Sequence, residues 1–191
     1  MFKYTKVPAN TFRNLQMNAG ILLKDFTVND GSFEDTDLIG ATTGGLNFTA
    51  TPSYEDFGED VDNCPKNTKE LKKLTDWEVK LSGTLVTMTG EVAKMLTAVA
   101  DYATNKVTPR SELELSDFED LWMVCDYTDV NSGANAGYIA IHIMNALSTS
   151  GFQIQTTDKG KGQFAFEFTG HYSIDAQDTV PFEIYVKEGT T

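Results

Sequence analysis

QFAFEFTGHYSID, residues 163–175, is the stretch that decides the fold. Large apolar residues recur at every second position, with polar residues between them. A period of two gives a β-strand one apolar face and one polar face. The pattern predicts a strand of about twelve residues, longer than the usual five or six. The apolar positions are Phe164, Phe166, Phe168, Tyr172 and Ile174.

The same alternation recurs elsewhere and predicts further strands. It is strongest over residues 77–85, WEVKLSGTL, where Trp77, Val79, Leu81 and Leu85 share one parity. Residues 121–127, LWMVCDY, are apolar on both parities, which is typical of a strand covered on both sides. Residues 156–163, TTDKGKGQ, indicate a hairpin turn. Shorter alternating runs lie at residues 46–50, 139–143, 152–154 and 182–186.

One segment breaks this rhythm, TGEVAKMLTAVADYA at residues 89–103. Its apolar residues fall at helical spacing, with Thr89 placed to cap the first turn and Glu91 near the positive end of the helix dipole. The pattern predicts one amphipathic helix over residues 90–103. The apolar stripe consists of Val92, Met95, Leu96, Val99 and Tyr102.

About eight strands and one helix predict a mainly β fold, an antiparallel β-sandwich or barrel of two packed sheets with one flanking α-helix. We expect residues 1–191 to form a single domain, because a chain of this length can bury a sizeable core. Residues 27–44 and 53–76 lack sustained periodicity. Long irregular segments in a small domain are usually functional, so both stretches are candidate assembly arms.

Charge is distributed unevenly along the chain. The formal net charge is -13, which disfavours tight binding to phosphate backbones. Residues 25–65 contain acidic residues and no Lys or Arg, and a lysine cluster follows directly. We hypothesise that the acidic segment of one copy meets the lysine segment of a neighbour, against the alternative of a solvated loop. The candidate interface residues are Glu55, Asp56, Glu59, Asp60, Asp62, Lys66, Lys69, Lys72 and Lys73.

No set of residues with catalytic or metal-binding spacing is evident. His142 and His171 lie inside predicted strands without a neighbouring serine or cysteine elbow, which favours structural histidines over catalytic bases. Cys64 and Cys125 are far apart and lack the CxxC spacing of a zinc site or redox pair. The glycines near residue 160 lack the spacing of a phosphate-binding loop. We therefore expect no enzyme activity, metal or cofactor.

Two further features exclude other classes of protein. No run of 18 apolar residues occurs, so membrane insertion is not expected. Trp77 and Trp122 lie on apolar parities, which favours core filling over a platform for sugar binding.

The order of these segments resembles a known family. NALSTSGFQIQTTDKGKGQFAFEFTGHYSIDAQDTVPFEIYV, residues 145–186, looks like the closing segment of major tail tube proteins from long-tailed bacteriophages. GGLNFTATPSYEDFGEDVDNCPKNTKELKKLTDWEVKLSGTL, residues 44–85, resembles the first sheet strand, long loop and next strand of that family. Together the two segments cover more than half of the chain.

The resemblance implies a structural function. Subunits of this family form hexameric rings whose inner sheets merge into a β-barrel, and the rings stack head to tail as a conduit for genome DNA, which passes without specific binding. The implied partners are copies of the chain, a tape-measure protein, a tail terminator and distal tail or baseplate proteins. The implied location is the virion tail, assembled in the bacterial host cytoplasm. A hexamer would carry a formal charge of -78, six times -13.

The polar face of the strand at residues 163–175 then becomes a candidate lumen or interface surface, through Glu167, Thr169 and His171. Two alternatives stay open at this stage. One is the tube of a phage-derived bacteriocin or injection machine, and the other is a monomeric β-sandwich module that binds a ligand.

Overall fold

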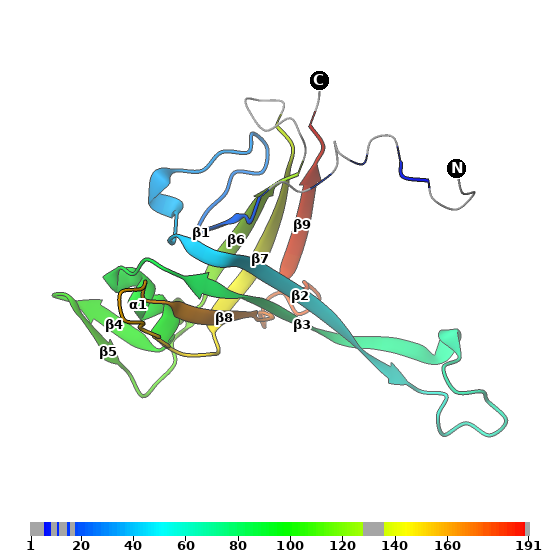
Figure 1. The fold of residues 1–191 in the computed structure, drawn as a ribbon. Helices are drawn as coiled ribbons and strands as arrows, with labels where there is room; N and C mark the ends of the chain where they lie inside the picture. Colours follow the sequence, from blue (N-terminus) through cyan, green and yellow to red (C-terminus); the bar gives the residue numbers. More distant parts are fainter. Residues whose placement is uncertain (1–5, 9–10, 12–14, 16–17, 128–135, 190–191) are drawn as a thin grey trace.

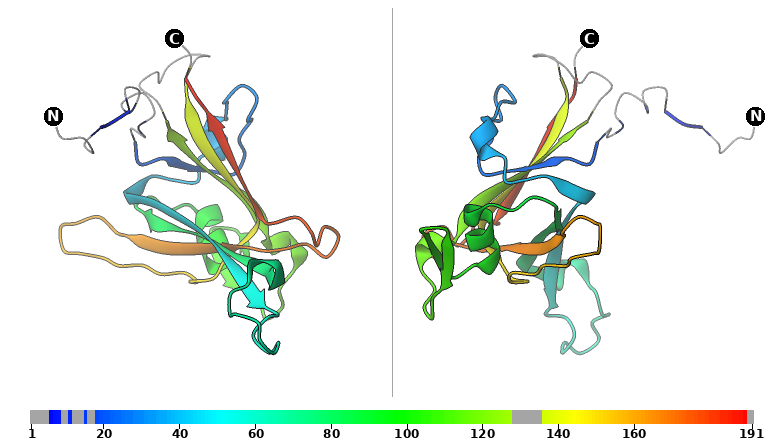
Figure 2. Two further views of the ribbon diagram at one scale, coloured as in Figure 1. Left: turned by 90° about the vertical axis from the view of Figure 1, so that its right-hand side faces the viewer. Right: turned by 60° about the vertical axis from the view of Figure 1, so that its left-hand side comes forward.

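The computed structural model describes residues 6–8, 11, 15, 18–127 and 136–189, and shows a mainly β protein with one α-helix (Figures 1 and 2). The remaining positions of the predicted single domain lie outside the described residues. The strands are β1 (Ile21–Leu23), β2 (Thr42–Asp56), β3 (Lys72–Leu85), β4 (Ala100–Ala103), β5 (Lys106–Pro109), β6 (Glu119–Asp126), β7 (Tyr138–Ser148), β8 (Phe164–Gly170) and β9 (Phe182–Lys187). The helix is α1 (Gly90–Thr97), and short 3-10 turns span Asp35–Asp37, Lys69–Leu71 and Leu115–Asp117.

Strand β7 joins the two halves of the large antiparallel sheet. Its first part pairs with β6 on one side and β9 on the other, and its last two residues, Leu147 and Ser148, pair with β8. The order β1-β6-β7-β8-β3-β2 runs through this junction, and β4 and β5 form a separate small sheet. In Figure 1, β2, β3 and β8 cross the direction of β6, β7 and β9. The predicted β-sandwich-like arrangement is therefore confirmed.

The main core lies between these two halves. Alternate residues of β3 and β8 point into it, including Val79, Leu81 and Phe168, and they meet Leu121 and Ile143 from the opposite half. All five side chains are buried. The alternation seen in the sequence at residues 77–85 and 164–168 thus corresponds to real burial.

The second face of the β6–β7 half is also covered. Trp122 and Ala140 belong to a smaller apolar cluster with Leu23, Phe26 and Tyr138. This confirms the interpretation of residues 121–127 as a strand covered on both sides. The segment that follows β1 provides the cover, since the Tyr138 hydroxyl donates a hydrogen bond to the carbonyl of Val28.

Residues 27–44, a candidate arm, therefore lie against the body of the protein. Ile39 is buried in the main core, and its amide donates to the Leu22 carbonyl at 3.1 Å. The stretch contains the 3-10 turn Asp35–Asp37 and then enters β2 at Thr42. An assembly role for it stays a prediction.

The helix is shorter than predicted. It starts as expected, with the Thr89 hydroxyl accepting a hydrogen bond from the Val92 amide at 3.2 Å. It ends at Thr97, because Ala98 adopts φ 68 and the chain turns into β4. Val99 and Tyr102 therefore lie outside the helix, and the prediction of a helix to residue 103 is wrong.

A tight hairpin replaces the missing helical turns. Thr104 and Asn105 both have positive φ, 52° and 60°, as a two-residue turn between twisted strands requires. The ring of Tyr102 packs on Gly90, where an added Cβ would lie only 2.0 Å from the ring. Tyr102, whose spacing looked helical, instead holds β4 against the start of α1.

Strand β8 is also shorter than the predicted strand of about twelve residues. It ends at Gly170, where a Cβ would lie 3.1 Å from both the Ile143 side chain and the Pro181 carbonyl. The chain then leaves the sheet, and Tyr172 and Ile174 become exposed. The prediction of one buried apolar face through residue 175 is therefore wrong beyond Gly170.

The run at residues 152–154 does not form a strand. Phe152 and Ile154 are exposed, and only an isolated bridge between Gln155 and Gln163 closes the following turn. The strand prediction at residues 152–154 is wrong, since two alternating apolar residues are too few to define a buried face.

Candidate assembly surfaces

The hairpin arm, residues 53–76, projects away from the body (Figure 1). The pairing of β3 with β8 ends at Val79, so the outer part of β3 pairs with β2 alone. The ends of this predicted irregular stretch are in fact strand, because β2 continues to Asp56 and β3 starts at Lys72. Among residues 53–76, all of which the structure describes, only Gly58 is buried.

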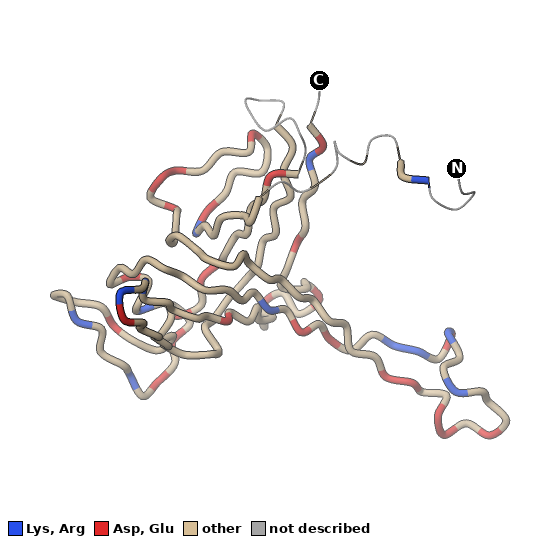
Figure 3. The backbone as a smooth tube through the Cα atoms, in the orientation of Figure 1, with Lys and Arg blue, Asp and Glu red and all other residues tan. Residues whose placement is uncertain are grey.

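The predicted acidic and basic residues meet within the same hairpin. Register places Glu55 opposite Lys73 and Asp56 opposite Lys72. Figure 3 shows the lysines along the β3 side of the arm and the acids along the β2 side and its tip. Lys66 forms an ion pair with Glu59 at 2.9 Å, Lys69 pairs with the adjacent Glu70 at 3.4 Å, and Lys72 lies 5.4 Å from the centre of the Tyr54 ring.

Six of the predicted interface residues form no ion pair in the described part of the chain. They are Glu55, Asp56, Asp60, Asp62, Lys72 and Lys73. Contact of the acidic segment with a neighbouring copy stays a prediction, since one chain does not test it.

The carboxylate of Asp56 organises the arm's tip. Its two oxygens accept hydrogen bonds from the Asn67 amide at 2.8 Å and the Gly58 amide at 2.9 Å. These two bonds, followed by the positive charges of Lys72 and Lys66, hold the pKa of Asp56 below its ordinary value of 3.8. Asp56 is thus a structural residue of the tip as well as a candidate interface residue.

Apolar side chains on the arm face solvent. Tyr54, Phe57, Val61 and Leu74 are all exposed. A two-stranded hairpin is marginally stable by itself, and exposed apolar groups of this kind often mark a binding surface.

The outer face of β2, β3 and β8 is polar. Phe166 and Phe168 point inward, so Glu167 and Thr169 point outward. Lys80 lies between Glu78 at 2.7 Å and Glu167 at 4.0 Å, and the hydrogen bond to Glu78 raises the pKa of Lys80 above its ordinary value of 10.5. Hydroxyl and amide side chains fill much of the remaining face, among them Asn47, Thr49, Thr51, Ser82, Thr84 and Thr149.

His171 lies just beyond β8, the strand that carries Glu167 and Thr169. Its amide donates to the Met144 carbonyl of β7 at 3.3 Å, and its Nδ1 lies 3.1 Å from the Asn145 carbonyl oxygen. The Asn145 side-chain amide donates to the His171 carbonyl at 3.1 Å. His171 thus lies one residue beyond the end of β8, and its predicted role in a lumen or interface stays a prediction.

His171 also lines a surface groove that the sequence did not indicate. The groove has a volume of about 460 Å³ and is mainly apolar. Two of its lining side chains are unusually exposed, Leu115 at 91% and Ile174 at 83%. We define the groove by Leu115, Phe118, Asn145, His171, Tyr172 and Ile174.

Acidic residues surround this groove. Asp175 lines it, and Asp178 lies three residues further along, in the next turn of the chain. Residues 112–120 on the other side contain five acids, Glu112, Glu114, Asp117, Glu119 and Asp120. Two bases reach these acids. Arg110 is held by Asp101 and Glu114, both at 3.0 Å, and by the buried Asp117, and Lys24 pairs with Glu119 at 3.7 Å. The groove therefore combines apolar lining side chains with more acidic than basic residues around it.

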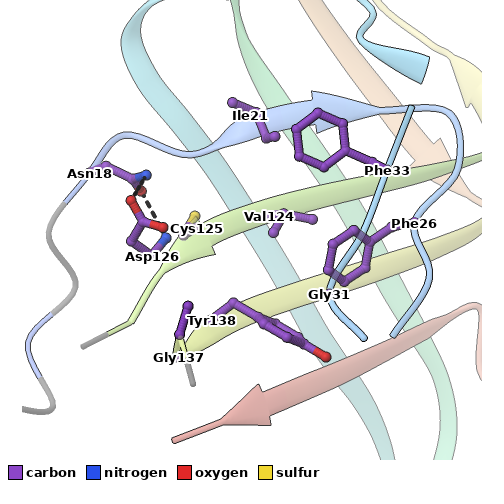
Figure 4. Close-up of a pocket in the computed structure, with 11 residues that line it drawn as sticks. Asn18, Ile21, Phe26, Gly31, Phe33, Val124, Cys125, Asp126, Gly137 and Tyr138 are labelled. Atoms are coloured by element: carbon purple, nitrogen blue, oxygen red, sulfur yellow. Dashed lines mark hydrogen bonds between the residues drawn. The ribbon is translucent and has the colours of Figure 1, made fainter. Parts of the chain in front are cut away.

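A second pocket, of about 150 Å³, lies beside Cys125 (Figure 4). Asn18 donates to the Asp126 carboxylate at 2.7 Å at one end, and Phe26 and Tyr138 close the other. Burial, followed by the charge of Asp126, raises the pKa of Cys125 to about 11, so the thiol stays protonated at neutral pH. Cys64 is a separate free thiol in the hairpin arm. The pocket is smaller than ordinary ligand sites.

His142 is fixed by its neighbours. Its ring stacks on Trp122 with centroids 4.1 Å apart, and Nε2 lies 3.2 Å from Asp120. The other nitrogen, Nδ1, lies 3.9 Å from Glu183. Both nitrogens thus face carboxylates, an arrangement that suits a structural histidine better than a base beside a nucleophile.

No protein-family model matches the chain, and no curated protein matches it. Within the described residues, no three His, Cys, Asp or Glu side chains gather as a possible metal site. The helices in the same residues also lack the length and apolarity needed to cross a bilayer.

Proposed function

We propose that this protein is a structural subunit of a bacteriophage tail tube, which forms stacked hexameric rings as a conduit for genome DNA and catalyses no reaction. The observation that carries this proposal is the hairpin arm, a long two-stranded projection with exposed apolar side chains at Tyr54, Phe57, Val61 and Leu74. A two-stranded projection is marginally stable by itself, and exposed apolar side chains of this kind mark a surface that a second molecule can cover.

Free sheet edges support the same proposal. Among the described residues, strand β9 pairs with β7 on one side only, and its Ile184 and Val186 are exposed. Exposed edges with apolar residues invite pairing with further strands, and closure of several copies into a barrel would remove them.

The polar outer face supports a conduit. Glu167, Thr169 and the neighbouring hydroxyl groups present a surface with few apolar side chains, and the chain carries a net charge of -13. If this face lines the bore of a ring, it repels phosphate groups, so DNA slides without sticking. The implied partners are further copies, a tape-measure protein, a tail terminator and distal tail proteins, in a virion tail assembled in the host cytoplasm.

The test is the assembly state of the purified full-length chain. Negative-stain electron microscopy and light scattering across a range of protein and salt concentrations are expected to show six-fold rings or hollow rods. A particle that stays monomeric throughout, also when the implied partners are added, would contradict the proposal and favour a ligand-binding module.

A pair of variants sharpens this test. Phe57→Ser together with Leu74→Ser removes apolar surface from the arm and is expected to reduce assembly without changing the melting temperature. Leu38→Ser is the matched control, because Leu38 is as exposed as Leu74 but lies on the body.

A further inference from the structure

The groove and the hairpin arm have complementary chemistry. The groove presents exposed Leu115 and Ile174 within an acidic surrounding that includes Asp175 and Asp178. The start of β3 and the turn before it present exposed Leu74 directly after three lysines, in the sequence KELKKL at residues 69–74. Apolar contact at the centre and opposite charges at the rim are the usual composition of a specific protein interface.

The lysines of the arm are not neutralised by the body of their own chain. Lys73 forms no ion pair within the described residues, and Lys69 contacts only the adjacent, exposed Glu70. Two acids of the arm already have partners within the arm: Asp56 accepts hydrogen bonds from two backbone amides, and Glu59 pairs with Lys66. Lys69 and Lys73 can therefore pair with an acidic surface on another molecule, and the surroundings of the groove provide such a surface.

A chain cannot place its own arm in its own groove. The Trp77 amide donates to the hydroxyl of Tyr172, a groove residue, at 3.0 Å, which fixes residue 77 beside the groove. From there β3 extends outward in register with β2, so Leu74 and Lys73 lie about 10–13 Å away along a paired strand. Folding back would break the pairing of residues 72–76.

The geometry points to a second copy of the chain as the occupant: the groove of one copy receives the β3 edge of another copy's hairpin arm, residues 69–74. Leu74 contacts Leu115 and Ile174, and Lys69 and Lys73 face Asp175 and Asp178. This inference rests on the proposed self-assembly and names one of its contacts. Because groove and arm are different surfaces, the contact is head to tail, and its repetition from copy to copy builds either a closed ring or an open stack.

Site-specific photocrosslinking tests the contact directly. Ile174→p-benzoylphenylalanine places a photoreactive group in the groove at a side chain whose exposure makes the change tolerable for folding. Irradiation of assembled protein is expected to join this position to residues 69–74 of another copy, identified by mass spectrometry of the crosslinked peptides. Val186→p-benzoylphenylalanine is the control, since Val186 is exposed on β9 outside the groove, and its crosslinks are expected to map outside residues 69–74.

Charge reversal provides a second, independent readout. Lys69→Glu with Lys73→Glu, and separately Asp175→Lys with Asp178→Lys, are each expected to raise the critical concentration for assembly by about tenfold or more. The chain that carries all four changes restores opposite charges across the contact, so its critical concentration is expected to return toward that of the unmodified protein.

The outcomes separate the two proposals. Rings or rods that form normally, with crosslinks from position 174 mapping elsewhere and without rescue in the fourfold variant, would overturn the groove contact and leave the tube proposal standing. A chain that never self-associates would overturn both. Crosslinks only to a different protein would also overturn the assignment of a second copy.

Discussion

Strand β3 passes through two different environments, and the contrast explains how the molecule divides its tasks. From Val79 to Leu85 it is hydrogen-bonded on both sides, by β2 and β8, and Val79, Leu81 and Leu85 are fully buried. From Lys72 to Glu78 it has one neighbour, β2, and no buried side chain. The inner half stabilises the fold, and the outer half leaves its side chains partly or fully exposed, where the proposed assembly would use them.

The largest expected difference between these regions is the cost of removing an aromatic ring. Phe168→Ala opens a cavity in the core, where Phe168 is 1% exposed, and is expected to lower the free energy of unfolding by about 3–5 kcal/mol. Phe57→Ala on the arm is expected to change it by less than about 0.5 kcal/mol. Urea denaturation monitored by tryptophan fluorescence measures both. Equal costs would show that the arm shares the core's cooperative packing.

A smaller effect is expected where the two regions meet. Tyr172→Phe removes the hydroxyl that accepts the Trp77 amide at 3.0 Å, and is expected to cost about 0.5–1.5 kcal/mol of unfolding free energy. Amide hydrogen exchange at Trp77 is expected to accelerate in the same variant. The matched control is Tyr54→Phe on the arm, whose hydroxyl has no hydrogen bond among the described residues. If Trp77 exchange is unchanged, the anchor between arm and groove is not the hydroxyl.

The smallest expected effect is confined to the tip of the arm. Because the folded-state pKa of Asp56 lies below its ordinary value of 3.8, ionised Asp56 stabilises the tip above that pH. This stabilisation is lost as the pH falls through the lowered pKa. NMR of the Gly58 and Asn67 amides is expected to show stable hydrogen bonds from neutral pH down to about pH 4 and their loss below it.

Two variants test the origin of this pH dependence. Asp56→Asn is expected to weaken both amide hydrogen bonds at every pH, whereas Asp60→Asn is expected to leave them unchanged. Loss of the tip's order in the Asp60 variant would mean that general repulsion among the acids, and not the Asp56 hydrogen bonds, sets the transition.

The central parts of the strands could be predicted from the sequence, because burial imposes alternation directly. Val79, Leu81, Phe166 and Phe168 show this, and Leu121 to Cys125 correctly indicated a strand covered on both faces. The ends of elements could not be predicted in the same way. Ala98 adopts a positive φ that no residue type in the segment signals, so the helical spacing of Val99 and Tyr102 was misleading.

The candidate surfaces were predictable only in part. The location of the charged arm followed from clustered acids and lysines, but the ion pair between Glu59 and Lys66 depends on a hairpin register that charge alone does not reveal. The groove was missed because Leu115, Asn145 and Ile174 come from distant parts of the sequence. One weak signal for them is present in the sequence: Ile174 continues the apolar alternation of β8, although the strand ends at Gly170.

The junction at β7 has a mechanical consequence. A pull on the arm along its axis enters β3, passes to β8 through seven register pairs and reaches β7 at Leu147 and Ser148. Antiparallel hydrogen bonds lie perpendicular to the strands, so such a load shears all of the β3–β8 bonds together instead of peeling them one at a time. A pulling force on the arm is therefore transmitted through β3, β8 and β7 to the neighbouring strands β6 and β9.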